Sequence, residues 1–238
     1  TREEETKMKQ VLRQEKKYII SKTDYIKYSA AFNTYLAQDE NNGEHGYMVR
    51  SLYFDTLWDN DFVEKEDGVE IRRKIRLRIY KPTDQFAGLE MKQKQGSQQL
   101  KRSLKMTRED AILLTKGIYT PLLGYKDPFA KELYAVMNMR FYRPKAIVEY
   151  NRKAFIAKEN SIRITFDHNI RATESCFDIF SENLNTYPVF SQDRVILEVK
   201  YNGFLLSYIK DMLDRVEQSE LSVSKYALSR TICLNYVF

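Results

Sequence analysis

Alternation of apolar and polar residues along most of the chain predicts β-strands. A period of two residues means that each strand buries one face and presents the other to polar surroundings. The predicted strands cover residues 11–20, 47–55, 69–80, 86–94, 98–106, 145–157, 161–169, 175–180 and 194–201. Gln95, Gly96 and Ser97 separate two of these strands and predict a hairpin.

Helices are predicted between and after the strands, several of them with a capping residue. Ser21 or Thr23, Thr107 and Asp127 each precede a helical segment, and their side chains suit the N-cap position. The first of these helices is expected to run to about residue 37, the second to about 116, and the third to end before Pro144. Further helices are predicted over residues 58–65, 205–216 and 224–235.

Antiparallel strands with helices between and after them predict an α+β fold. The chain has 238 residues, few glycines and prolines, and no internal repeat. We therefore expect one domain over residues 11–238, preceded by a flexible or helical lead-in at residues 1–10.

The strongest local pattern is VEIRRKIRLRIY at residues 69–80. Because side chains alternate in a strand, one face carries a row of cations spaced about 7 Å apart. That face holds Arg72, Lys74, Arg76 and Arg78, and the opposite face holds Ile71, Arg73, Ile75, Leu77 and Ile79. A solvated surface is the ordinary interpretation of a charge run, but solvated faces usually mix both signs. A row this uniform favours an anionic partner.

Charged residues share a face on other predicted strands as well. The sets are Arg13, Glu15 and Lys17; Glu90, Lys92 and Lys94; Tyr150 and Arg152; Arg163, Thr165 and Asp167; and Glu198 and Lys200. In an open sheet this pattern means that the apolar face packs on the core and the charged face is exposed to water. In a closed barrel it produces a charged lumen whose apolar outer face is covered by helices. A cationic lumen requires a polyanion such as a phosphate chain, for which arginine and lysine are suited.

Composition narrows the class of protein. A hydrophobic fraction of 43% excludes a fully disordered chain, and a net charge of +6 is mild. No apolar run approaches the ~18 residues of a membrane span. Cys176 and Cys233 are too few for a disulfide framework and fit a reducing compartment, so we predict a cytoplasmic location.

Eight segments carry a family resemblance, in order along the chain. They are RQEKKYII at 13–20, SLYFDT at 51–56, IRRKIRLRIY at 71–80, LEMKQK at 89–94, VEYNRKAF at 148–155, IRITFDHNIRA at 162–172, VILEVKY at 195–201 and SVSKYALS at 222–229. With these segments the chain resembles the VTC polyphosphate polymerase domain, a branch of the triphosphate tunnel metalloenzyme (CYTH-like) superfamily. The resemblance spans about residues 11 to 230.

The resemblance implies an eight-stranded antiparallel β-barrel tunnel with a cationic lumen and flanking helices. It implies that the γ-phosphoryl group of ATP is transferred onto a growing polyphosphate chain with a divalent metal, Mn or Mg. The expected partners are ATP or another triphosphate and polyphosphate, with no specific nucleic acid.

The resemblance also assigns roles to residues by motif position. Expected catalytic residues are Arg76, Arg78, Lys92 and Glu198, with Glu198 as the metal ligand. Expected phosphate-binding residues are Lys17, Arg76, Arg78, Lys92, Lys101, Arg152, Arg163, Lys200 and Lys225. Arg72 and Lys74 share the basic face and are assigned to an entrance.

Two departures from the hydrolytic branch favour the polymerase. Arg13 replaces the first glutamate of a Glu-x-Glu-x-Lys motif, and Lys200 follows Glu198 on the same face. Fewer carboxylates weaken metal binding for water activation. A triphosphatase of the same fold and a non-catalytic binder of polyphosphate or nucleic acid remain alternatives; the binder requires exposed aromatics for stacking. We expect the aromatics on the strands or at their ends to lie in the core instead; they are Tyr53, Phe54, Tyr80, Phe155 and Phe166.

Overall fold

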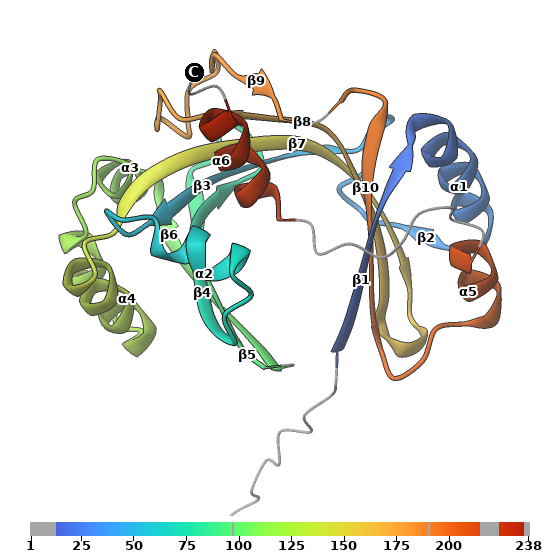
Figure 1. Ribbon diagram of the computed structural model, residues 1–238, viewed down its shortest axis with the longest axis horizontal. Coiled ribbons are helices and arrows are strands. Elements are labelled where there is room, and N and C mark those ends of the chain that lie inside the picture. The colour runs from blue at the N-terminus through green and yellow to red at the C-terminus, as the bar shows by residue number, and fades with distance from the viewer. Residues whose placement is uncertain (1–12, 97, 190, 215–223, 236–238) are drawn as a thin grey trace, which may run out of the picture. The chain divides into compact units, whose positions relative to one another are not determined.

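The computed structural model describes residues 13–96, 98–189, 191–214 and 224–235, so the predicted lead-in at residues 1–10 lies outside the described part. Figure 1 shows the elements in chain order. The strands are β1 (Arg13–Ser21), β2 (Ala37–Gln38), β3 (Tyr47–Asp55), β4 (Ile71–Ile79), β5 (Phe86–Gln95), β6 (Gln98–Thr107), β7 (Arg143–Ala157), β8 (Ile162–Thr173), β9 (Tyr187–Pro188) and β10 (Arg194–Asn202). The α-helices are α1 (Lys22–Tyr35), α2 (Asn60–Glu66), α3 (Arg108–Thr115), α4 (Pro128–Met139), α5 (Ser207–Asp214) and α6 (Lys225–Asn235). Two short 3₁₀ helices are η1 (Thr120–Gly124) and η2 (Glu159–Ser161).

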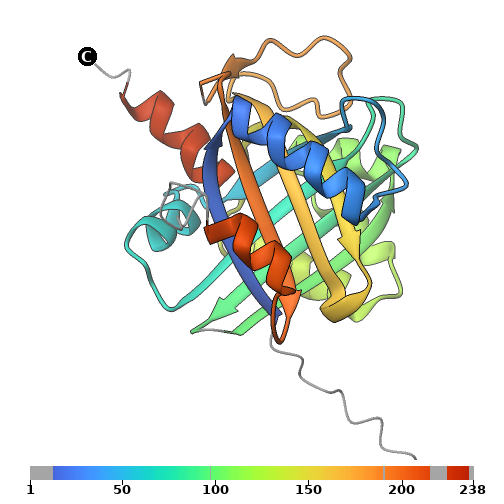
Figure 2. The same ribbon diagram turned by 90° about the vertical axis from the view of Figure 1, so that its right-hand side faces the viewer.

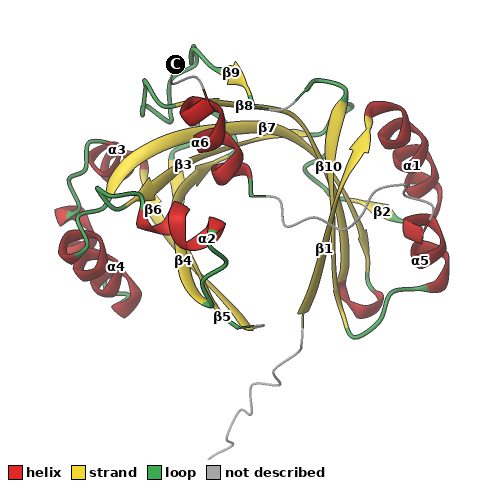
Figure 3. Ribbon diagram, in the orientation of Figure 1, coloured by secondary structure: helices red, strands yellow, loops and turns green. Residues whose placement is uncertain are grey.

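The strands form one antiparallel sheet, which confirms the predicted α+β class (Figure 3). Within the described residues the main path of pairing has eight strands in the order β1-β10-β8-β7-β3-β4-β5-β6, the number that the resemblance implies. The short strands β2 and β9 pair with β7 and β8. The path ends at β1 and β6, so these pairings do not by themselves close a barrel.

The chain divides into two compact units. The first unit comprises Thr1–Gly46, Lys153–Asp167 and Asp193–Ser222, and the second comprises Tyr47–Arg152, His168–Gln192 and Val223–Phe238. Strands β7 and β8 pass through both units. One domain over residues 11–238 therefore stays a prediction.

Helices α1 and α5 cover the apolar face of the first unit (Figure 2). Phe32 of α1 and Ile209 of α5 are fully buried against Phe166 and Leu197 of the strands. The start of α1 is fixed by Ser21, whose hydroxyl accepts a hydrogen bond from the backbone N–H of Asp24, as predicted. The other face of these strands is left to charged side chains.

Helices α3 and α4 cover the corresponding face of the second unit. Leu114 of α3 and Leu133 of α4 belong to one hydrophobic cluster with Ile75 and Leu77 of β4, and all four side chains are fully buried. The predicted caps are confirmed, since Thr107 accepts from the backbone N–H of Asp110 and Asp127 caps α4. Because β4 turns its apolar side chains to these helices, its basic residues lie on the opposite face.

The prediction of a strand at residues 175–180 is wrong. The segment is irregular, although Ile179 and Phe180 are buried in the core of the second unit. Arg50 donates from Nη1 to the carbonyl oxygens of Ile179 (2.9 Å) and Ser181 (2.5 Å). A guanidinium thus takes the place of a neighbouring strand in satisfying these backbone groups.

No helix in the described part of the chain is both long enough and apolar enough to cross a lipid bilayer. Cys176 is a free, partly exposed thiol, and the side chain of Cys233 lies outside the described part.

Candidate functional site

Strand register brings the basic residues of β4 beside polar residues of β3, β5 and β6. Residues directly opposite in antiparallel strands share a face. One row of partners runs Tyr53, Arg76, Glu90 and Ser103, and the next runs Lys74, Lys92 and Lys101. The predicted shared face of Arg72, Lys74, Arg76 and Arg78 is therefore confirmed by strand parity, and it continues onto the adjacent strands. Arg72 lies opposite Lys94 and donates from Nη1 to the carbonyl oxygen of Val69 at 2.9 Å. We call this set, with the residues of β7 and α6 described below, the basic face of the second unit.

Glu90 is the acidic partner within the basic face. Its Oε2 accepts from Arg76 at 2.7 Å and its Oε1 accepts from Lys101 at 2.7 Å. Burial of the carboxyl opposes its ionisation, but the positive charges of Arg76, Arg78 and Lys101 outweigh burial and lower the pKa of Glu90 to about 2. Glu90 is therefore a carboxylate at every physiological pH and fixes the orientation of Arg76.

Arg78 is buried and is held by hydroxyl groups. Its Nε donates to Ser51 Oγ at 3.1 Å, and its Nη2 lies 3.5 Å from the hydroxyl of Tyr150. Neither partner carries a formal charge, so these two contacts orient the guanidinium without neutralising it. A buried cation of this kind interacts strongly with any anion that reaches it.

Two cations of the basic face contact the ring of Tyr150. The Nζ of Lys225, the first residue of α6, is 4.8 Å from the centroid of the Tyr150 ring, and the guanidinium carbon of Arg152 is 5.4 Å from it. Aromatic rings attract cations through their quadrupole, so Tyr150 helps to hold both side chains at the face.

Tyr53 also supports cations on this face. Its hydroxyl accepts from Arg76 Nη1 at 3.4 Å, and the Nζ of Lys74 is 6.0 Å from its ring centroid. Burial raises the pKa of Tyr53, but the charges of Arg76, Lys74 and Arg78 outweigh this effect and lower the pKa to about 8. The expectation that Tyr53 is a core residue is confirmed by its burial, and its hydroxyl is in addition part of the face. The same expectation is wrong for Tyr80, which follows the end of β4 and is 49% exposed.

The first unit carries a separate charged cluster, which we call the mixed-charge cluster. Register places Lys17 opposite Glu198, and Lys200 opposite both Glu15 and Arg163. Lys17 contacts Glu15 and lies 4.0 Å from Glu198 Oε2, and Lys200 contacts Glu198. Each of the two glutamates therefore lies across from a lysine, and the cluster is far closer to neutral than the basic face.

Two further residues complete the mixed-charge cluster. Arg163 Nη2 is 2.7 Å from Oδ2 of the buried Asp39. Thr165 lies opposite Glu198, and its hydroxyl is buried without a hydrogen-bond partner among the described residues. A buried hydroxyl left unpaired costs about 1–3 kcal/mol, so this position suits a water molecule or a ligand oxygen.

The site residues that the resemblance names thus fall into two groups. The second unit holds Arg76, Arg78, Lys92, Lys101, Arg152 and Lys225, and the first unit holds Lys17, Arg163, Glu198 and Lys200. Arg102, next to Lys101, faces the other way and pairs with Glu132 of α4 at 2.5 and 2.6 Å.

Sequence reasoning missed several contributors. The sequence places Glu90 on a charged face with Lys92 and Lys94 but assigns it no role, and its contacts with Arg76 and Lys101 come from the structure. Asp39 lies between predicted elements and gave no signal. Tyr150 shares a predicted face with Arg152, but no role was predicted for it or for Tyr226.

The donor set fits a metal only with the help of substrate oxygens. Within the described residues, no three histidine, cysteine, aspartate or glutamate side chains form a group able to hold a metal ion. Glu15 and Glu198 both approach the ammonium of Lys17. One or two carboxylates plus phosphate oxygens and waters are typical of Mg²⁺ sites at phosphate substrates, and Glu198 with Glu15 fits that pattern.

Comparisons with known proteins bear on the family and the fold. A family model described as "VTC domain" matches residues 12–233. A search among curated proteins finds no match. A solved structure described as a "putative adenylate cyclase" from Bacillus halodurans has a TM-score of 0.53 at 10% identity, covering 90% of this chain and 93% of that one. Another with the same description, from Vibrio parahaemolyticus, has a TM-score of 0.46 at 13% identity, covering 92% and 98%. The first likeness supports the fold alone.

Proposed function

Because the chain belongs to the VTC-domain family, we propose that it is a polyphosphate polymerase that transfers the γ-phosphoryl group of ATP onto a growing polyphosphate chain. In this reaction a terminal phosphate oxygen of polyphosphate attacks the γ-phosphorus. The bond between that phosphorus and the β–γ bridging oxygen breaks, and ADP leaves. The attacking oxygen is already anionic, so no general base is required.

One observation carries this proposal: Lys74, Lys92 and Lys101 lie directly opposite one another on three adjacent strands. Like charges in directly opposite positions destabilise a sheet. An anion that carries several negative charges along its length relieves this repulsion, whereas a monovalent anion relieves little of it. The repulsion therefore favours a phosphate chain as the ligand.

The arginines of the basic face supply the directed hydrogen bonds. Arg76 is oriented by Glu90 and Arg78 by Ser51, so both guanidinium groups are preorganised. Preorganised donors stabilise charge that develops in a transition state, and phosphoryl transfer depends mainly on such positioning. We assign Arg76 and Arg78 to the triphosphate, with Lys92, Lys101, Arg152 and Lys225 along the phosphate chain.

In the first unit, Lys17, Arg163 and Lys200 are assigned to phosphate oxygens and Glu198, with Glu15, to a divalent metal. When bound, Mn²⁺ or Mg²⁺ would offset negative charge on the phosphate oxygens. Without the metal, Lys17 and Lys200 orient the two glutamates through ion pairs.

The mixed-charge cluster favours the polymerase over a triphosphatase. Hydrolysis requires a water molecule activated by a metal or a carboxylate. Here Glu15 lies opposite Lys200 and Glu198 opposite Lys17, so each carboxylate is offset by an ammonium group. These pairs favour holding phosphate oxygens over deprotonating water.

Ligand-induced stabilisation tests the binding part of the proposal. Tripolyphosphate at about 100 times its dissociation constant stabilises a folded protein by about 2.7 kcal/mol. We expect a clear rise in melting temperature with tripolyphosphate and a much smaller rise with orthophosphate at the same ionic strength. Equal shifts for both anions would contradict the proposal.

A further inference from the structure

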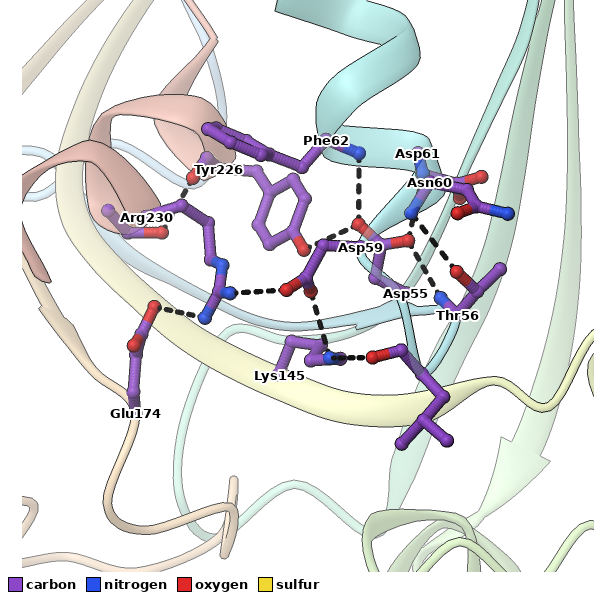
Figure 4. A network of polar contacts seen from close by, with 12 residues as sticks. Asp55, Thr56, Asp59, Asn60, Asp61, Phe62, Lys145, Glu174, Tyr226 and Arg230 are labelled. Atoms are coloured by element: carbon purple, nitrogen blue, oxygen red, sulfur yellow. Dashed lines mark hydrogen bonds and ion pairs between the residues drawn. The ribbon is translucent and has the colours of Figure 1, made fainter. Parts of the chain in front are cut away.

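The C-terminal helix α6 is anchored within the second unit by a buried polar network (Figure 4). Tyr226 donates from its hydroxyl to Asp55 Oδ2 at 2.7 Å. Arg230, one turn further along α6, donates from Nη2 to Asp59 at 2.7 Å and from Nη1 to Glu174 at 2.8 Å. The three acceptors come from two segments distant in sequence from α6, so the network ties the helix to the end of β3 and to the segment after β8.

Asp55 is a rigid anchor point. Its carboxylate is fully buried and accepts from the backbone N–H groups of Thr56 (2.7 Å), Asp61 (2.9 Å) and Phe62 (3.0 Å). These three contacts fix the carboxylate at the start of α2. The hydroxyl of Tyr226 therefore donates to a carboxylate oxygen whose position is already fixed by backbone hydrogen bonds.

Asp59 is fixed by two cations, one at each of its carboxylate oxygens. Its Oδ1 contacts Lys145 Nζ at 2.8 Å while Oδ2 contacts Arg230. Its backbone adopts a left-handed conformation with φ 58°, which aspartate tolerates at a small cost. Arg230 is thus clamped between Asp59 and Glu174, with only 14% of its side chain exposed.

The first turn of α6 reaches the basic face. Ser224 caps the helix and its hydroxyl accepts from Lys74 Nζ at 2.8 Å. The Tyr226 ring stacks on Tyr53 with centroids 5.1 Å apart, and Lys225 lies over Tyr150. Residues 226 and 230 share one side of the helix. The clamp on that side therefore determines where Lys225 lies.

We propose that Arg230 is a positioning residue, and that its clamp to Asp59 and Glu174 sets the affinity of the basic face for phosphate chains by placing Lys225. The inference rests on the proposed function of the basic face. It assigns the acidic residues Asp59 and Glu174 a role in anion binding that neither could have through direct contact, because carboxylates repel phosphate. The clamp acts only through Lys225.

A double-mutant cycle separates positioning from general support of the fold. Tripolyphosphate affinity is measured by calorimetry for the wild type, Arg230→Gln, Lys225→Ala and the double variant, with melting curves to confirm folding. We expect at least roughly 10-fold weaker binding for Lys225→Ala, since a charge-assisted contact is worth about 1.5–3 kcal/mol and 1.4 kcal/mol is a factor of about 10. Arg230→Gln should weaken binding by a smaller factor of roughly 5, because it displaces Lys225 without removing it. The double variant should bind no more weakly than Lys225→Ala alone, because coupled residues are non-additive.

Equal weakening by Arg230→Gln in both backgrounds would overturn the inference, as would unchanged affinity in either single variant. Absence of tripolyphosphate binding by the wild type would instead contradict the proposed function. If Arg230→Gln does not fold, Glu174→Gln removes one acceptor of the clamp and is measured in the same cycle. Glu174→Gln should weaken tripolyphosphate binding by a smaller factor, and only when Lys225 is present. Equal weakening in the wild-type and Lys225→Ala backgrounds would again overturn the inference.

Discussion

Arg76 of β4 and Glu90 of β5 are direct cross-strand partners, with Arg76 Nη2 2.7 Å from Glu90 Oε2. The pair places one buried carboxylate inside a face dominated by cations. Glu90 engages the Nε edge of the guanidinium, and Lys101 takes its other oxygen. Arg76 is thereby oriented while the face as a whole remains strongly positive.

Replacing Arg76 should remove much of the affinity for tripolyphosphate. Arg76→Ala is expected to weaken binding roughly 10- to 100-fold, the loss of about 1.5–3 kcal/mol for hydrogen bonds to a charged group. The matched control is Arg102→Ala, because Arg102 lies on β6 of the same sheet but pairs with Glu132 of α4 on the opposite face. Calorimetric titration of both variants checks this, and equal losses would contradict the assignment of the basic face.

Glu90 should contribute stability that depends on pH. Its folded-state pKa of about 2 lies below its ordinary 4.5, so the contribution is complete above pH 4.5 and is lost as the pH falls towards 2. Glu90→Gln is expected to be less stable than the wild type by about 1–3 kcal/mol at pH 7. Urea unfolding at pH 7 and pH 3 should show a smaller difference at pH 3; the same difference at both would argue against the pairing.

Asp61 should show the opposite dependence on pH. The carboxyl is buried beside Asp55, and burial and that neighbouring charge raise its pKa to about 8, against a hydrogen bond from Tyr142 that lowers it. The folded state then binds a proton more tightly than the unfolded state, so stability falls as the pH rises from about 4 to about 8. Urea unfolding at pH 5.5 and 8.5 should show a larger loss for the wild type than for Asp61→Asn. Parallel losses would refute the raised pKa.

Glu198 should be required for metal-dependent turnover and not for anion binding. Glu198→Gln is expected to lower Mn²⁺-dependent turnover of ATP about 10- to 100-fold, the usual cost of disturbing a metal site. Tripolyphosphate affinity without metal should be kept or increased, since a negative charge is removed. Glu132→Gln, on α4, is the control carboxylate, and normal Mn²⁺-dependent turnover in Glu198→Gln would exclude the ligand role.

The basic face was predictable because its signal is local. Strand parity in residues 71–79 separates the cations from Ile75 and Leu77, and the caps Ser21, Thr107 and Asp127 mark the helices that cover the apolar faces. Each of these features depends on neighbours within a few residues. The structure confirms them almost to the residue.

Contacts between distant segments were not predictable. Arg50 donates to carbonyl groups about 130 residues away, in and next to the irregular segment 175–180 that was predicted to be a strand. Asp39 meets Arg163, and Arg230 meets Asp59, across similar separations. A charged residue whose partner lies in another segment leaves no periodic pattern in the sequence.

Product analysis tests the central claim most directly. The purified chain is incubated with ATP and Mn²⁺, and the products are resolved by gel electrophoresis and nucleotide chromatography. A polymerase yields a ladder of long polyphosphate and one ADP for each phosphoanhydride bond formed. Release of orthophosphate with no polyphosphate would contradict the claim and identify a hydrolase on the same fold.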